Sequence, residues 1–302
     1  MCIYSGMDRM HTPPVSRFTF IIIIILIIAI AASCGRTPAE TTTAARRIVS
    51  LSPSLSRMLA DLEAAEMLAG VTSFDDFRDR AQVVGSMVRP NAELILSINP
   101  DLVIFSEDDG SVQAVDSLSS AGLRVRRFPK TRSFDDIIAN YLTLASIISR
   151  DKPAVKKIEG YRARRSAEVA RPRSSHRPRV AFLVSVKPLI AASDESYIGA
   201  IIRDAGGECA VRSVAALFPI LSLESLVAAH PEIIIVMSEQ EADWESCRRI
   251  LAPFPNLARR VRGITPSHVA YYTPSDYIQS VNEIRALIEP LSGQGGRSSI
   301  NR

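Results

Sequence analysis

Histidine, the side chain most often used for proton transfer and for binding transition metals, is scarce in this chain. Only four occur among 302 residues: His11 and His176 lie outside the expected helices and strands, whereas His230 and His268 lie near or within them. Two isolated histidines do not predict a His-rich metal site, and a Ser/His/Asp triad would have to be built on His268. We therefore expect no catalytic residue, no metal site and no cofactor.

Other motifs of catalysis or nucleotide binding are also absent. The chain has no G-x-S-x-G elbow and no GKS or GxGxxG loop, since Gly206-Gly207 is followed by Glu-Cys. Its 36 basic and 32 acidic residues give a net charge of +4. The arginines are scattered rather than gathered in a basic stripe with aromatics, so nucleic-acid binding is not expected. An exported hydrolase is the least favoured function.

Two glutamates occur in matched settings. Residues 93–104 read ELILSINPDLVI, and residues 224–235 read ESLVAAHPEIII, with each glutamate seven residues before the proline. A second pair of segments, beginning at Arg47 and Arg179, keeps nearly the same offset. Two unrelated helix-to-strand units are the alternative, but two pairs at almost the same offset favour a duplication. The sequence thus predicts two similar α/β lobes.

The predicted elements alternate between strands and helices, which favours parallel sheets covered by helices on both faces. We expect an N-terminal lobe at 47–150, a connecting helix at 151–171, a C-terminal lobe at 178–291 and a disordered tail at 292–302. The first helix is expected at 54–68, closed by Gly70, and the last strand within 264–272. Such folds bind ligands at the carboxyl ends of their strands, so we expect a ligand cleft between the lobes.

The N-terminus has the features of an export signal. Two arginines precede an apolar run at 18–32, which has the length of a signal peptide core and is short for a membrane-spanning helix. It ends in Ala31-Ala32-Ser33-Cys34, which resembles the lipobox of bacterial lipoproteins, although leucine is usual at the position of Ala31. The resemblance implies a signal peptide at 1–33, lipidation of Cys34 and a flexible tether at 34–46. The alternative is an uncleaved anchor helix; either way we expect an exported protein held at a membrane.

Two further cysteines, Cys209 and Cys247, fall in the second lobe. An oxidising compartment would allow them to form a disulfide. Two separate buried thiols are the alternative, and the sequence does not decide between them.

Several motifs together resemble the substrate-binding lipoproteins of ABC importers for iron-siderophores, haem and vitamin B12. The most specific is Val84-Gly85-x₄-Pro90-Asn91-x-Glu93, which continues into residues 99–104, NPDLVI. Residues 47–53 (RIVSLSP) and 204–207 (DAGG) also fit. The resemblance covers roughly residues 47–290. It implies a monomeric receptor that captures a metal chelate or cobalamin and delivers it to an ABC permease dimer.

In that family a glutamate on the rim of each lobe docks into arginine pockets of the permease. The resemblance assigns this role to Glu93 and Glu224, although either could be an ordinary first-turn helix glutamate. A surface lipoprotein that keeps the fold without transport is the alternative function.

The loops that follow the strands are expected to line the cleft. By position, the expected ligand-binding residues are Ser52, Pro53, Phe74, Met87, Arg89, Ser106, Lys187, Phe218, Tyr271 and Tyr272. A corrinoid would need broad apolar walls, and an anionic ferric chelate would need cations such as Arg89 and Lys187. Haem would need an axial ligand, for which Tyr271, Tyr272 and His268 are candidates. The sequence leaves these ligands open.

Overall fold

The computed structural model describes residues 45–292 except 111, 173–174 and 214. The predicted signal peptide, the lipidated Cys34, nearly all of the tether and residues 293–302 of the tail lie outside the described residues. Ala44–Arg302 form one compact unit, and the description below concerns this unit.

The N-terminal lobe is built on a five-stranded sheet in the order β3-β2-β1-β4-β5, with every neighbouring pair parallel. Its strands are β1 Ile48–Ser50, β2 Leu68–Val71, β3 Gln82–Val83, β4 Leu102–Ser106 and β5 Val125–Phe128. Its helices are α2 Pro53–Asp61, α3 Ala92–Ile98, α4 Val112–Ser120 and α5 Phe134–Ile147. Successive strand residues face opposite sides: Ile48 and Ile104 pack with α2 and α5, whereas Val49 and Val103 pack with α3 and α4.

The C-terminal lobe has the sheet order β10-β9-β6-β7, with β8 also paired to β6. Its strands are β6 Arg179–Val186, β7 Leu189–Ala191, β8 Glu208–Cys209, β9 Ile233–Met237 and β10 Val261–Ile264. Its helices are α7 Tyr197–Ala205, α8 Leu223–Ala228, α9 Glu241–Ile250, α10 Pro255–Ala258 and α11 Pro274–Ser292. All strand pairs are parallel except β6 and β7, where the chain reverses at Lys187–Pro188. The predicted α/β class with parallel sheets is confirmed.

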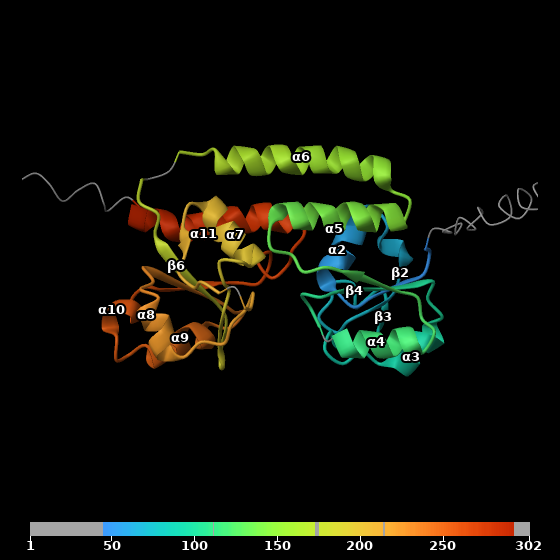
Figure 1. Cartoon of the computed structure of the whole chain (residues 1–302), viewed down its shortest axis with the longest axis horizontal. Helices are drawn as coiled ribbons and strands as arrows, with labels where there is room; N and C mark the ends of the chain where they lie inside the picture. The colour runs from blue at the N-terminus through green and yellow to red at the C-terminus, as the bar shows by residue number, and fades with distance from the viewer. Residues whose placement is uncertain (1–44, 111, 173–174, 214, 293–302) are drawn as a thin grey trace, which may run out of the picture. The chain divides into compact units, whose positions relative to one another are not determined.

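A long helix, α6 Asp151–Val169, packs against α5, α7 and α11, on the side of the sheets away from α3 and α8 (Figure 1). One carboxylate in each lobe holds it. Asp61 of the N-terminal lobe accepts hydrogen bonds from the Tyr161 hydroxyl at 2.8 Å and the Tyr141 hydroxyl at 2.5 Å. Asp204 of the C-terminal lobe pairs with Arg165 at 2.7 Å. The helix is therefore tied to both lobes.

Two boundaries predicted from the sequence are wrong. Helix α2 ends at Asp61, because Glu63 takes a left-handed backbone conformation (φ 56°) that a helix cannot continue. Gly70 lies in β2 rather than at a helix end; a Cβ there would stand 2.9 Å from the Val84 side chain, so packing requires the glycine. The last strand is Val261–Ile264, and residues 265–273 form the loop that follows it.

Both lobes contain the same joint between the first strand and the glutamate-bearing helix. The Arg47 guanidinium donates to the Ile98 carbonyl at 2.8 Å, and the Arg179 guanidinium donates to the Ala229 carbonyl at 2.8 Å. These carbonyls lie at the carboxyl ends of α3 and α8, where a cation also opposes the negative end of the helix dipole.

The acidic residue of each repeat completes the joint. Asp101 accepts the backbone N–H of Arg47 at 2.8 Å, and Glu232 accepts that of Arg179 at 3.0 Å. The two repeated segments of the sequence therefore meet in space in the same way in both lobes.

We expect Arg47→Met and Arg179→Met each to lower the free energy of unfolding by about 1–2 kcal/mol, because each leaves helix-terminal carbonyls without their charged donor. Urea denaturation measures the change. The matched control is Arg46→Met, an exposed neighbour, which should change stability by less than about 0.5 kcal/mol. Equal effects at Arg46 and Arg47 would contradict the role of the joint.

Candidate functional site

Loops at the carboxyl ends of strands from both lobes meet around Tyr272. This residue is 3% exposed and lies in the loop between β10 and α11. Its hydroxyl donates to Asp109 and lies 2.9 Å from the Ser52 hydroxyl, and its backbone N–H donates to the Ser54 hydroxyl at 3.3 Å. Ser52 precedes α2 and Asp109 follows β4. A single tyrosine of the C-terminal lobe thus joins two loops of the N-terminal lobe.

Asp109 has an unusual electrostatic environment. The pKa of its carboxyl is raised to about 6, chiefly by burial. The nearby carboxylates of Asp108 and Asp75 also act to raise it, whereas hydrogen bonds from Ser52 and Tyr272 act to lower it. Burial also raises the pKa of the Tyr272 phenol well above its ordinary value. The phenol therefore keeps its proton at neutral pH and can donate it to Asp109.

Arg57, in α2, makes a second connection between the lobes. Its guanidinium pairs with Asp76 at 2.6 Å within its own lobe and with Asp276 of α11 at 3.0 Å. It also donates to the Ser267 carbonyl at 3.3 Å and lies 3.5 Å from the centre of the Tyr271 ring. This stacking is a cation–π contact. Arg57 therefore links the N-terminal lobe to both the β10–α11 loop and α11.

An aromatic group lines the C-terminal side of the same region. The Tyr197 ring lies 6.3 Å from Phe218 and 5.8 Å from Tyr272, both edge-on. The Tyr197 hydroxyl donates to the Val269 carbonyl at 2.9 Å, so the ring is fixed at the first turn of α7.

The residues expected to line the cleft divide into three groups by exposure. Ser52, Pro53, Ser106 and Tyr272 are buried; Met87, Phe218 and Tyr271 are partly exposed; Phe74, Arg89 and Lys187 are exposed. The structure brings three of them together: Ser52 contacts Tyr272 directly, and Tyr197 lies between Tyr272 and Phe218. Phe74, in the loop after β2, is 66% exposed and does not belong to the core.

Sequence reasoning missed Arg57, Asp109 and Tyr197. Asp109 had a recognisable signal, since the acidic run 107–109 directly follows a buried strand. Arg57 and Tyr197 sit in ordinary amphipathic helices, and nothing in their local sequence distinguishes them.

The three candidates for an axial haem ligand already have partners. The Tyr272 hydroxyl is bound to Asp109, the Tyr271 ring lies against Arg57, and His268 Nδ1 lies 2.8 Å from Asp276. Burial raises the pKa of both tyrosines, which opposes the phenolate form that binds iron. Coordination through either tyrosine would require these contacts to rearrange.

Glu93 and Glu224 occupy the first turns of α3 and α8. The side chains of Asn91 and Ser222 cap these helices, accepting from the backbone N–H of Leu94 at 3.0 Å and of Ser225 at 3.1 Å. Ile95 and Leu226 are buried beneath them, which turns each glutamate outward.

Both glutamates are exposed, and in the described part of the chain neither forms an ion pair. Hydrogen bonds from its own backbone N–H and from Ser222 lower the pKa of Glu224, so it is ionised at neutral pH. Each helix therefore presents an exposed carboxylate that is available to an external cation.

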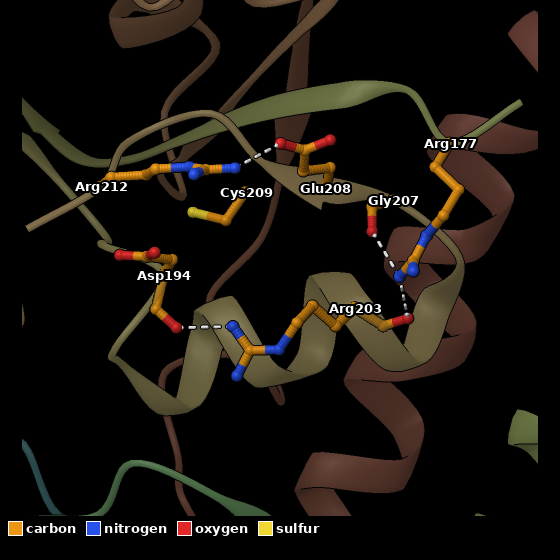
Figure 2. Close-up of a pocket in the computed structure, with 7 residues that line it drawn as sticks. All are labelled: Arg177, Asp194, Arg203, Gly207, Glu208, Cys209 and Arg212. Carbon is orange, nitrogen blue, oxygen red and sulfur yellow. Dashed lines mark hydrogen bonds and ion pairs between the residues drawn. The ribbon is translucent and has the colours of Figure 1, made fainter.

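Figure 2 shows a separate pocket of about 210 Å³ in the C-terminal lobe, lined in part by Arg177, Arg203 and Arg212. The Arg177 guanidinium donates to the Gly207 carbonyl at 3.0 Å, Arg203 to the Asp194 carbonyl at 2.5 Å, and Arg212 to Glu208 at 3.0 Å. These contacts hold the two ends of α7 and the start of β8, so the arginines have structural partners.

Three further observations concern the described residues only. No group of three His, Cys, Asp or Glu side chains is placed to hold a metal ion. None of the helices is both long and apolar enough to cross a membrane. Cys209 and Cys247 are free and buried, so the two-thiol alternative is the one observed, and burial raises the pKa of each thiol to about 11.

The sequence is similar to a known protein family and to named relatives. The model of the family "Periplasmic binding protein" matches residues 48–248. The vitamin B12-binding protein of Vibrio parahaemolyticus is 22% identical over 200 residues, which cover 65% of this chain and 72% of that protein.

Two solved structures have similar folds. The vitamin B12-binding protein of Vibrio cholerae superposes with a TM-score of 0.69 at 17% identity, covering 83% of this chain and 99% of that one. A periplasmic haem-binding protein in complex with two haems gives a TM-score of 0.69 at 22% identity, covering 82% and 98%. At these low sequence identities the superpositions show that the fold is shared.

We expect Asp109 to make stability fall as pH rises. Its folded pKa of about 6 lies above the unfolded value. Its contribution to the free energy of unfolding is therefore fully present below the unfolded pKa and is lost as pH rises through about 6. Relative to Asp109→Asn, the wild type should lose about 2 kcal/mol between pH 4 and pH 7, measured by urea denaturation.

Asp101→Asn is the control of opposite sign. Hydrogen bonds from the backbone N–H groups of Arg46 and Arg47 lower the pKa of Asp101, so the wild type should gain stability over that variant as pH rises from acid. A wild type and an Asp109→Asn variant with parallel pH profiles would contradict the assignment to Asp109.

Proposed function

The chain belongs to the periplasmic binding protein family, and from this we propose that it captures an iron complex, such as a siderophore or haem, or cobalamin and delivers it to an ABC permease. The family match confirms the resemblance inferred from the sequence and identifies the chain as a solute-binding protein rather than an enzyme. Relatives named for vitamin B12 and haem support these ligand classes.

The observation that carries the delivery function is the pair of exposed glutamates. Each lies on a short helix held by the same arginine joint, and in the described residues each lacks an ion-pair partner. Two separated carboxylates, one per lobe, can bind two arginine sites of a permease dimer and fix the orientation of the receptor.

We place the ligand between the lobes, against the residues that follow the strands. Phe74, Met87, Arg89, Lys187, Phe218 and Tyr271 present accessible surface for it, whereas Ser52, Pro53, Ser106 and Tyr272 would form the floor beneath. The ties of α6 to Asp61 and Asp204 limit the lobe movement that binding requires, because a packed helix bends less readily than an extended hinge.

We also propose that a signal peptide at 1–33 is removed and that lipidated Cys34 anchors the receptor on the extracytoplasmic face of a membrane. Two acyl chains on the cysteine and one on its amino group would anchor it stably, whereas a single chain would not. In this proposal the receptor is a monomer, with one lobe formed by residues 47–150 and the other by residues 178–291.

The central experiment joins a binding screen with an uptake assay. The protein should bind one of haem, cobalamin or a ferric siderophore saturably; failure with all three would count against the receptor function.

Glu93→Ala combined with Glu224→Ala should reduce uptake at least about tenfold, since each lost charge-assisted contact costs on the order of 1.5–3 kcal/mol, while ligand affinity stays unchanged. Asp151→Ala, which removes an exposed first-turn carboxylate from α6, is the matched control. Unchanged uptake in the double variant would sink the docking assignment.

The anchor has its own test. Cys34→Ser should abolish the incorporation of radiolabelled palmitate, because the acceptor of the lipid is lost, and Cys2→Ser should not. Metabolic labelling followed by immunoprecipitation measures both. A Cys34→Ser protein labelled as strongly as the wild type would contradict lipidation of Cys34, and an unlabelled wild type would instead favour the uncleaved anchor helix.

A further inference from the structure

Both glutamate-bearing helices carry an apolar side chain that is exposed or partly exposed, one turn after the glutamate. Leu96 follows Glu93 by three residues and is 43% exposed. Val227 follows Glu224 by three residues and is partly exposed. Residues three apart on a helix are surface neighbours. Each carboxylate therefore stands beside apolar surface.

On the C-terminal lobe this surface continues into a pocket of about 390 Å³, which we call the α8 pocket. Its apolar lining comes from Val227, Pro231, Pro253, Phe254, Pro255 and Leu257, and its polar lining from His230, Asn256 and Arg260. Phe254 is 38% exposed there, a large apolar side chain left accessible at the surface.

The walls of the α8 pocket are held in place. The Arg260 guanidinium donates to the Pro231 carbonyl at 3.0 Å, and the Phe254 carbonyl accepts the backbone N–H of Leu257 at 2.9 Å. Three prolines further restrict the backbone. A preformed pocket loses little conformational entropy on binding, which favours affinity.

We propose that the α8 pocket receives an apolar side chain from the permease subunit whose basic residue binds Glu224. This inference rests on the proposed docking of Glu224. The pocket is continuous with the surface around Glu224, because Val227 belongs both to the pocket and to the helix of Glu224. A permease loop that reaches the Glu224 carboxylate therefore also covers the pocket. Six of the nine lining residues are apolar, which favours an aliphatic or aromatic side chain as the occupant.

The α8 pocket would also distinguish the lobes. Its counterpart on α3 is the exposed Leu96. A permease dimer therefore meets a recess on one lobe and an apolar projection on the other, in addition to one carboxylate on each.

The test measures binding of the full-length protein to the permease–ATPase complex of its own organism in lipid nanodiscs. Val227→Ser combined with Phe254→Ser should raise Kd about tenfold, as expected when apolar anchors are removed from an interface, and Val227→Ser alone should raise it less. The salt dependence of Kd should stay the same, because no charge has changed. Glu224→Ala should weaken both the binding and its salt dependence. Val155→Ser, at a valine 50% exposed on α6, should leave Kd unaltered.

The outcomes separate this inference from the function it rests on. If Glu224→Ala weakens binding but the Val227/Phe254 variant binds as the wild type does, the α8 pocket plays no part and only this inference is overturned. A wild type that binds no permease overturns the docking function as well. If the variant changes only self-association, measured by analytical ultracentrifugation, the pocket receives a second copy of the chain and the inference is again overturned. The ligand affinity and the unfolding midpoint of each variant should match those of the wild type. A rise in the Kd for the permease in a Val227/Phe254 variant that meets this condition supports the proposal.

Discussion

The joint between the first strand and the glutamate-bearing helix is the constraint on which both lobes depend. An arginine side chain binds the last carbonyls of the helix, and the acidic residue after the proline binds the backbone of the strand. Since β1 pairs with β4 and β6 with β9, this joint sets where each helix lies against its sheet. It thereby sets where Glu93 and Glu224 emerge at the surface.

A different set of contacts governs how the lobes meet. α6 is tied to Asp61 on one side and to Asp204 on the other. The Tyr272 phenol and the Arg57 guanidinium add polar contacts across the same boundary. Buried polar groups with satisfied partners specify one arrangement more strictly than apolar packing does. These contacts therefore favour a limited change of lobe orientation when a solute is bound, in keeping with the ties on α6.

The two proposed functions of the molecule use different elements. The contacts of Tyr272 and Arg57 lie where strands end and helices α2 and α11 begin, whereas Glu93, Glu224 and the α8 pocket lie on α3, α8 and α10. Helix α6 is on the side of the sheets away from α3 and α8 (Figure 1). The proposed ligand contacts and the proposed permease contacts therefore involve different residues.

The sequence by itself determined the α/β alternation, the duplication and the two glutamate helices, because these depend on local signals. Apolar runs mark the strands, the Asn91 and Ser222 caps mark the helix starts, and the repeat offset relates the lobes. Local signals were weaker at the ends of helices and strands. Helix α2 ends earlier than its apolar pattern indicates, because Glu63 takes a left-handed backbone conformation.

Only the tertiary structure decided which polar groups meet. Tyr272 and Asp109 are 163 residues apart in the chain, and Arg57 and Asp276 are 219 apart. Sequence periodicity reports which face of an element is buried, but carries no distance between residues on different elements. The same limit explains why the hydrogen bond between Ser52 and Tyr272, both predicted to line the cleft, was not foreseen. It also explains why the α8 pocket was not foreseen, because its lining comes from the α8–β9 and α9–β10 segments, which approach each other only when β9 and β10 pair.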